Sequence, residues 1–386
     1  MKFLKSIKKN VFVLGLASFF ADISSEMLYP IIPIFLTSSL GAPMSVVGLI
    51  EGIVESTASV LKAVSGWLSD SIKKRRPLVV LGYLSSSLAK PVLFLSYSWP
   101  VVLLARFVDR LGKGIRTSPR DAMIADSSEA SYRGKAFGFH RAMDSLGACI
   151  GPLLAIWFLS VFKENLRLVF LVAFIPALLA VLTLIFFLKE TPITARAEGA
   201  GKRFDVKFLN SDFKKFLIAS SIFAIGNSSD AFLILRSKQL GLSVTLVILA
   251  YVLYNISYSA LSLPFGALSD KMPRKRVMIM GYSIFALVYV GFGLAASAKI
   301  IWALFPIYGF YIAMTDGVGK ALVSDMVQEE HRATALGLYH FVLGIFAFFA
   351  SFIAGLLWTR VGVSAPFIYG AATALLSSLA LFILIK

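Results

Sequence analysis

Long, almost uninterrupted apolar stretches fill this chain of 386 residues, and each is long enough to cross a lipid bilayer as a helix. A transmembrane helix needs about 20 predominantly apolar residues, and only helices or closed barrels satisfy their backbone hydrogen bonds within the hydrocarbon. A barrel would instead show segments of about ten residues in which polar and apolar positions alternate. The sequence therefore predicts an all-α, polytopic membrane protein.

Composition supports this class and excludes several others. Hydrophobic residues make up 58% of the chain and charged residues 15%, whereas soluble domains carry about 25% charged residues. One cysteine and three histidines exclude a disulfide framework and a zinc-type ligand cluster. The sequence has no phosphate-binding loop of the G-x4-G-K-[S/T] type, no serine-hydrolase elbow and no metalloprotease histidine motif. We therefore expect no cofactor, no metal and no enzyme activity.

The apolar pattern predicts twelve transmembrane spans. They cover residues 10–38, 45–69, 77–97, 100–126, 133–162, 165–188, 213–236, 243–269, 276–297, 300–325, 331–359 and 363–385. The first span carries Asp22 and Glu26 and lacks a cleavage site of small residues, so we expect a permanent helix rather than a signal peptide. A polar segment divides the spans six and six. We predict an N-terminal six-helix bundle at 1–188, a cytoplasmic linker at 189–212 and a C-terminal six-helix bundle at 213–386.

Lysine and arginine residues in the loops and toward the ends of the spans are distributed unevenly: 26 are assigned to one side of the membrane and six to the other. By the positive-inside rule, both termini are then cytoplasmic. The net charge of +17 fits loops that face an anionic leaflet, so we expect no nucleic-acid partner. We expect a monomer in the cytoplasmic (inner) membrane of a prokaryote.

Three short patterns recur in the same order in the two halves of the chain. They pair residues 66–70 and the basic run 74–76 with 266–270 and 274–276, residues 24–26 with 228–230, and Asp126, Arg133 and Gly138 with Asp325, Arg332 and Gly337. This order indicates two homologous halves in a pseudo-twofold arrangement. Parallel halves of six helices with a site at their interface are a recurrent transporter design.

The Gly-x-Leu-x-Asp pattern with its basic run, after the second and eighth spans, resembles the signature loop of the major facilitator superfamily. The resemblance covers essentially the whole chain and implies a secondary transporter that works by alternating access. A second pattern resembles the fifth-helix element that this superfamily associates with antiporters. Its residues, which we expect to act as a hinge, are Gly138, Gly147, Gly151 and Pro152.

The signature loops also predict a conformational latch. An aspartate at a cytoplasmic helix end can form charge-assisted hydrogen bonds with a basic cluster of the other bundle, and these bonds must break on switching. Acidic-basic turns after the fourth and tenth spans belong to the same resemblance. The residues assigned to the latch are Gly66, Asp70, Arg75, Arg76, Gly266, Asp270, Arg276, Glu129 and Arg133.

Ionisable residues within the spans need a partner, water or a function, because a charge at the bilayer centre costs at least about 2.5 kcal/mol on insertion scales. Asp22 and Glu26 are four residues apart and share one helix face near mid-depth. Two carboxylates in a low dielectric repel each other, which suits reversible binding of a proton. The predicted proton-coupling residues are Asp22, Glu26, Glu55 and Asp144. The structural alternative is a permanent pairing of Asp22 or Glu26 with an arginine of the fourth or fifth span.

The second half carries fewer charges and more tyrosines, so we expect it to supply aromatic and hydrogen-bonding contacts to a substrate. The predicted substrate-cavity residues are Lys90, Arg106, His140, Arg141, Asn227, Asp230, Tyr254, Asn255, Tyr258 and Tyr311. Lys90 pairs either with an acid of the first span or with an anionic substrate. Eight acids and six bases within the spans leave the charge of the substrate open.

The leading interpretation is a proton-coupled antiporter that exports a small organic solute. A proton- or cation-coupled uptake symporter is an alternative that the same carboxylates serve equally well. A non-transporting membrane sensor or assembly partner is a second alternative, and the costly charges within the spans argue against it. The expected partners are a small-molecule substrate, protons and the lipid bilayer.

Overall fold

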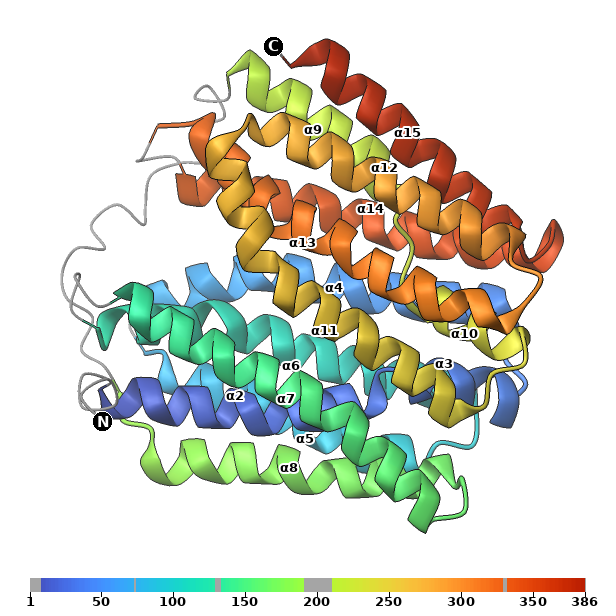
Figure 1. The fold of residues 1–386 in the computed structure, drawn as a ribbon. Coiled ribbons are helices and arrows are strands. Elements are labelled where there is room, and N and C mark those ends of the chain that lie inside the picture. Colours follow the sequence, from blue (N-terminus) through green and yellow to red (C-terminus); the bar gives the residue numbers. More distant parts are fainter. Residues whose placement is uncertain (1–7, 73, 129–132, 191–209, 329–331, 386) are drawn as a thin grey trace. The chain divides into compact units, whose positions relative to one another are not determined.

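The computed structural model describes residues 8–72, 74–128, 133–190, 210–328 and 332–385. Every regular element in these ranges is a helix, which confirms the all-α prediction (Figure 1). The helices form two compact units. One contains Met1–Ile32 and Thr57–Arg203, and the other contains Pro33–Ser56 and Phe204–Lys386.

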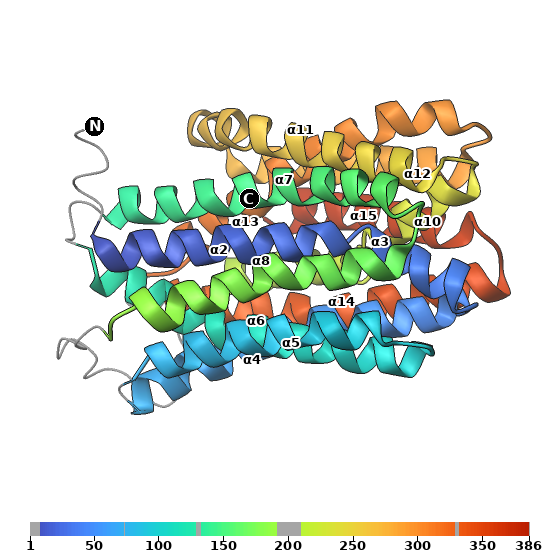
Figure 2. The same ribbon diagram turned by 90° about the horizontal axis from the view of Figure 1, so that it is seen from below.

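The first unit is built from long helices. They are α2 (Lys9–Leu28), the second half of α4 (Met44–Ile72), α5 (Arg76–Phe94), α6 (Trp99–Asp126), α7 (Arg133–Val161) and α8 (Leu166–Phe187). Helix α2 packs between α7 and α8, and α5 packs against α6 and α8 (Figure 2). The hydrophobic core of this first unit joins aliphatic side chains of α2, such as Leu14, to Val79 and Tyr83 of α5 and Leu184 of α8.

The second unit takes in the remaining elements. They are η1 (Phe35–Ser39), the first half of α4, α9 (Ser211–Ala224), α10 (Ala231–Gln239), α11 (Val244–Lys271), α12 (Arg274–Leu294), η5 (Ala298–Ile300), α13 (Ile301–Asp325), α14 (Arg332–Arg360) and α15 (Ala365–Leu384); the short α3 (Ile31–Ile34) joins the two units. Helix α13 packs against α11 and α12, and α15 packs against α9 and α12.

The boundaries of these two compact units differ in one place from those of the predicted bundles. Residues 33–56, which the sequence assigns to the N-terminal bundle, pack with the second unit. The predicted division rests on the duplicated pattern along the chain, whereas the units reflect which segments touch. The two criteria differ because one helix, α4, contributes its two halves to different units.

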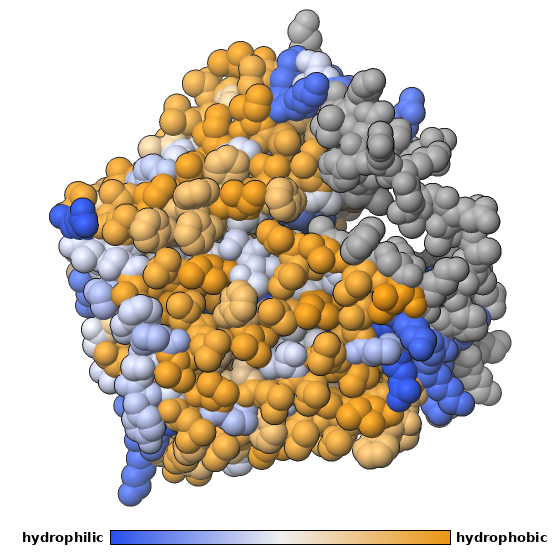
Figure 3. All heavy atoms as spheres, turned by 180° about the vertical axis from the view of Figure 1, so that it is seen from behind, coloured by the Kyte–Doolittle hydropathy of each residue, from blue (hydrophilic) through white to orange (hydrophobic). Residues whose placement is uncertain are grey.

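Among the described residues, ten helices are long and apolar enough to cross a membrane. The predicted spans at 100–126 and 213–236 are not among them. Helix α6 covers the first of these without a break, and its charged residues lower its hydropathy. Apolar side chains cover much of the surface seen in Figure 3, and Leu263 and Phe382 are among the large apolar residues that are more than two-thirds exposed. A surface of this kind is suited to lipid rather than water.

The seventh predicted span is not one helix, which corrects the expectation for 213–236. Helix α9 ends at Ala224 and α10 begins at Ala231. The intervening sequence contains Gly226 followed by Asn, Ser, Ser and Asp, which favour turns because their side chains compete for backbone hydrogen bonds. The freed backbone N–H of Ser229 donates to Ser351 Oγ of α14 at 3.1 Å.

Glycines let the backbones of α5 and α6 touch. A Cβ atom on Gly82 of α5 would lie 2.6 Å from both the carbonyl oxygen of Gly112 and the Cβ of Arg116 on α6. Membrane helices associate through close packing of this kind, since lipid provides no hydrophobic drive between them. The contact fixes the face of α6 that α5 covers.

We expect Gly82→Ala to lower the free energy of unfolding by about 1–3 kcal/mol, because the added methyl group overlaps α6. The measurement is thermal unfolding of the purified protein in detergent. Gly317→Ala in α13 is the control, since a Cβ there meets nothing within 4 Å. Alanine is the better helix former, so this control should leave stability unchanged or raise it. Equal effects of the two substitutions would contradict the packing argument.

Candidate functional site

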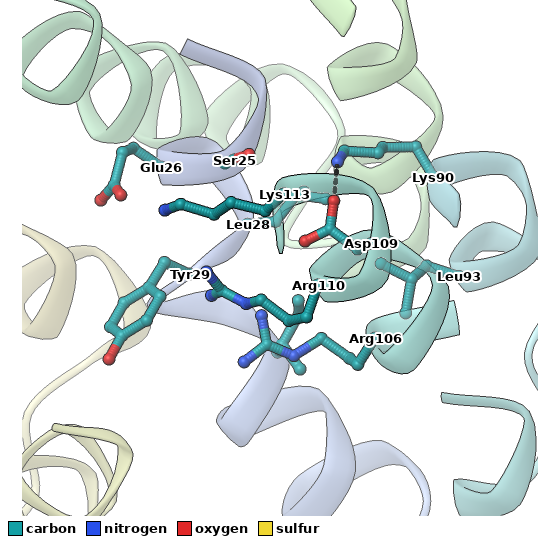
Figure 4. A pocket seen from close by; sticks show the side chains of 11 residues that line it. Ser25, Glu26, Leu28, Tyr29, Lys90, Leu93, Arg106, Asp109, Arg110 and Lys113 are labelled. Atoms are coloured by element: carbon teal, nitrogen blue, oxygen red, sulfur yellow. Dashed lines mark hydrogen bonds and ion pairs between the residues drawn. The ribbon is translucent and has the colours of Figure 1, made fainter. Parts of the chain in front are cut away.

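A hollow in the first unit lies between α2, α5 and α6 (Figure 4). Six charged side chains line it: Glu26, Lys90, Arg106, Asp109, Arg110 and Lys113. The four contributed by α6 recur at a spacing of three or four residues, so they share one face of the helix. Leu28, Ile32 and Leu93 give the same hollow an apolar wall.

The ion pair at one side of the hollow joins α5 to α6. Lys90 Nζ donates to Asp109 Oδ1 at 2.7 Å, and the Lys90 side chain is 3% exposed. Ser86 Oγ donates to the backbone oxygen of Asp109 at 2.9 Å, which holds the same turn of α6 in place. Lys90 thus lies in the predicted cavity, but its carboxylate partner comes from α6. The alternative of a partner in the first span is wrong.

Glycines of α7 allow this helix to contact the turn of α2 that carries Asp22 and Glu26. A Cβ on Gly147 would lie 3.0 Å from the Cβ of Asp22, and one on Gly151 would lie 3.0 Å from the Cβ of Glu26. Pro152 is buried. A Cβ on Gly138 meets nothing within 4 Å. Of the three glycines predicted to form a hinge, two therefore have a close-packing role that no larger residue can fill.

The close approach of α2 and α7 brings Asp22 and Asp144 together. The two carboxyl groups lie within hydrogen-bonding reach of each other. His140 Nδ1 is 3.4 Å from Asp144 Oδ2. On the other side of its ring, His140 Nε2 is 2.8 Å from Ser18 Oγ, which is also 2.8 Å from the Tyr83 hydroxyl. A chain of polar groups therefore runs from Asp22 through α7 to α5.

Several cations surround these acids. Arg120 of α6 and Arg141 of α7 are the basic groups whose charges act on Asp144, and Lys113 of α6 lies in the field of Asp22 and Glu26. His140 and Arg141, predicted as cavity residues, do not line the hollow. His140 is instead a buried member of the polar chain.

Among the charged residues of the hollow, sequence reasoning assigned Asp109, Arg110 and Lys113 to no site. It treated Arg110 only as a possible ion-pair partner and Lys113 as a loop charge that sets orientation. The structure places both on α6 among the lining residues (Figure 4). The signal was present, because charged residues recur every three or four positions from Arg106 to Arg120.

Three predicted cavity residues of the second half, Asp230, Tyr254 and Tyr311, lie in a tyrosine-rich cluster. Tyr308, which the prediction did not assign to the cavity, donates from its hydroxyl to Asp230 Oδ1 at 2.7 Å. The Tyr254 and Tyr311 rings each lie 5.3 Å from the Tyr308 ring. This cluster is largely buried within the second unit.

The other predicted residues of the second unit have local partners. Asn255 Nδ2 donates to the backbone oxygen of Tyr251 at 3.2 Å, and Tyr258 donates to Asp316 at 3.3 Å. Asn227 lies in the break between α9 and α10. Glu55, the fourth predicted coupling acid, belongs to this unit.

Corresponding helix ends in the two halves carry the same ion pair. Arg75 Nη1 donates to Asp126 at the end of α6, and Arg274 Nε donates to Asp325 at the end of α13 at 2.7 Å. The two pairs are separated by 199 residues, in agreement with the predicted duplication. Arg274 also lies 3.2 Å from Asp270.

The latch residues are therefore placed as follows. Arg75 and Asp270 form ion pairs, but Arg274 rather than the exposed Arg276 is the basic partner in the second half. The backbone N–H groups of Arg75 and Arg76 donate to Glu190. Gly66 and Gly266 lie within α4 and α11, and a Cβ on Gly266 meets nothing within 4 Å. Residue Glu129 and the side chains of Asp70 and Arg133 lie outside what the structure describes.

Comparison with known proteins gives one consistent result. The family profile described as Major Facilitator Superfamily matches residues 14–235 and, a second time, 216–386. An uncharacterized MFS-type transporter of Methanocaldococcus jannaschii is 39% identical over 383 residues, which cover 98% of this chain and 95% of the relative. The multidrug resistance protein MdtH of Aeromonas hydrophila is 25% identical over 331 residues, or 84% and 81% of the two chains. The crystal structure of the nucleoside transporter NupG matches with a TM-score of 0.80 at 14% identity, over 97% of this chain and all of the other.

The Lys90–Asp109 pair makes a stability prediction. We expect Asp109→Asn to lower the free energy of unfolding by about 3–5 kcal/mol, because it leaves a buried ammonium without its carboxylate. The double variant Lys90→Met, Asp109→Leu should recover most of this loss, since neither charge remains. Thermal unfolding in detergent measures both.

A matched control breaks an ion pair at the surface. Lys215→Gln removes the partner of Asp212 at 3.4 Å, at the start of α9 where these side chains are 38% and 59% exposed, and it should change the unfolding free energy by less than about 1 kcal/mol. A double variant as unstable as Asp109→Asn would show that the loss of stability does not come from the unpaired ammonium.

Proposed function

Because this chain belongs to the major facilitator superfamily and is therefore an integral membrane transporter, we propose that it exports a small organic solute in exchange for protons. The observation that supports this most directly is the pairing of Asp22 with Asp144, which the α2–α7 packing imposes. The proposal places both termini in the cytoplasm, in a monomer of the inner membrane, with protons as the second partner.

Two carboxyl groups within hydrogen-bonding reach are held together by a shared proton, and they repel each other when both are ionised. The Asp22–Asp144 pair faces Lys113 and Arg120 of α6 and His140 and Arg141 of α7. A movement that separates α2 from α7 separates the two acids. The nearby cations then compete with the proton for the carboxylates. Release of the proton is thereby tied to the packing of two helices.

Coupling follows if substrate and proton favour different packings of α2 against α7. A ligand shifts such an equilibrium only through its different affinity for the two states. Glu26 provides the link, because it lines the hollow and lies one helical turn beyond Asp22 on the same face. Solute in the hollow and the proton on Asp22 or Asp144 then act on the same helix, α2.

The outward direction has two supports. Gly147, Gly151 and Pro152 form the pattern that resembles the antiporter element, and the first two are the residues that bring α7 against the acids. A relative that covers most of the chain is named a multidrug resistance protein. Exchange of solute for protons suits export, since protons flow inward down their gradient.

The coupling prediction is tested in inside-out vesicles with an acid interior and a pH-sensitive dye. Addition of a transported solute, found from a panel of organic anions, lipophilic cations and chelators, should collapse the gradient. Asp22→Asn and Asp144→Asn should each abolish this response, because neither can release the shared proton. Asp212→Asn, at the exposed start of α9, is the control and should behave as the unaltered protein. Full responses in both single variants and in their combination would reject the coupling site.

A second prediction concerns the cytoplasmic ion pairs. Arg274→Gln removes the partner of both Asp270 and Asp325, so it should change the maximal transport rate at least about twofold while the half-saturating concentration of solute stays the same. Arg360→Gln, at the exposed end of α14, is the matched control. An altered half-saturating concentration at a normal maximal rate would assign Arg274 to binding instead of switching.

A further inference from the structure

We propose that the hollow in the first unit binds an organic oxyanion, namely a carboxylate or phosphate group carried on a small apolar body. The inference rests on the proposed exchange of an organic solute and names the charge of that solute. The sequence left this charge open because acids and bases within the spans are nearly balanced. The structure concentrates the bases in one place.

Four of the six charged groups that line the hollow are cations. The Lys90–Asp109 contact at 2.7 Å neutralises one cation and one acid. Arg106, Arg110 and Lys113 then face a single further carboxylate in the lining, that of Glu26 (Figure 4). The lining therefore has an excess of about two positive charges, and a cleft lined by one sign of charge attracts ions of the other sign.

The type of cation favours an oxyanion. A guanidinium group presents its N–H donors in a rigid planar fork that matches carboxylate and phosphate oxygens. Arg106 and Arg110 are four residues apart on α6, so their side chains point the same way, and both are less than 10% exposed. Like charges one helical turn apart repel each other. An anion bound between them relieves this repulsion.

The apolar part of the lining specifies the rest of the ligand. Leu28, Ile32 and Leu93 lie beside the charged groups, and Tyr29 adds an aromatic ring. A small inorganic ion would leave these side chains without contact. A ligand with an anionic end and an apolar body satisfies both parts of the hollow.

The alternative is that the cations serve only to neutralise Asp22 and Glu26 in a permanent structural network. The two accounts differ in whether the hollow admits ions and selects them by charge. Ser25 lines the hollow and is close in size to cysteine, and Cys149 is the single natural cysteine. Ser25→Cys in a Cys149→Ser background therefore provides one reactive thiol within the site.

The first measurement is the rate at which this thiol reacts with two methanethiosulfonate reagents. One reagent transfers an anionic ethylsulfonate group, and the other transfers a cationic ethyltrimethylammonium group. The ratio of anionic to cationic rates should exceed that of Ser98→Cys, at an exposed position outside the hollow, by at least about tenfold. Arg110→Gln should lower the ratio severalfold. Lys320→Gln, which removes one charge from the second unit, should leave it unchanged. Equal ratios at the two thiols, or no reaction at Ser25→Cys, would overturn the proposal.

The second measurement is protection of the same thiol by ligands of similar size and different charge. Phenyl phosphate and benzoate should slow its modification in a saturable manner, whereas benzyltrimethylammonium and benzyl alcohol should not. Protection by phenyl phosphate alone would assign the site to phosphate groups, and protection by benzoate alone to carboxylates. Protection by the cation, or by none of the four, would overturn the proposal. Neither measurement uses a proton gradient, so loss of coupled transport with intact anion selectivity would reject only the proposed exchange.

Discussion

The first unit depends on one constraint, which is that every charged group inside the hydrocarbon must be stabilised by the protein. Helix α6 carries charged residues along most of its length, and side chains of α5 act as partners for several of them. Lys90 meets Asp109 at 2.7 Å, while Arg116 donates to Ser86 Oγ at 2.7 Å and places its guanidinium 4.1 Å from the centre of the Tyr83 ring. Arg106, Arg110 and Lys113 line the hollow together with residues of α2. The hollow is therefore a consequence of how the charges of α6 are satisfied.

Close backbone packing decides where the acids of α2 lie. Gly147 and Gly151 remove the side chains that would hold α7 away from α2, so Asp22 comes within reach of Asp144. The second unit uses the same device between α11 and α13, where a Cβ on Gly309 would lie 2.8 Å from the carbonyl oxygen of Tyr254. That contact positions tyrosines instead of carboxylates. One packing rule for membrane helices thus supports two kinds of chemistry.

Helical periodicity predicted much of this arrangement. It placed Asp22 and Glu26 on one face, while the resemblance to the antiporter element marked the glycines of α7 and the recurring patterns revealed the duplication. It did not predict which helices pair, so the partner of Lys90 had to come from the structure. The spacing of 200 that relates the two signature loops carries Arg75 to Lys275 and Arg76 to Arg276. The arginine that forms the ion pair in the second half is instead Arg274, 199 residues after Arg75. The break before α10 was hidden because its flanking segments are apolar enough to read as one span.

The two halves keep the same ion pair at corresponding helix ends and differ at the recurring Ser-Ser-acid pattern. In the first half the acid is Glu26, which lines a hollow rich in cations. In the second half it is Asp230, which accepts a hydrogen bond from Tyr308. A hydroxyl is neutral, so this hydrogen bond does not compensate the charge of the carboxylate as a cation would. Glu26 instead lines the hollow for which we propose an anionic ligand, one helical turn from the proposed proton site at Asp22, so under these proposals either ion changes the charge around it. Two acids at equivalent places in the repeat thus have different surroundings, and the proposed coupling of anion and proton uses the first of them.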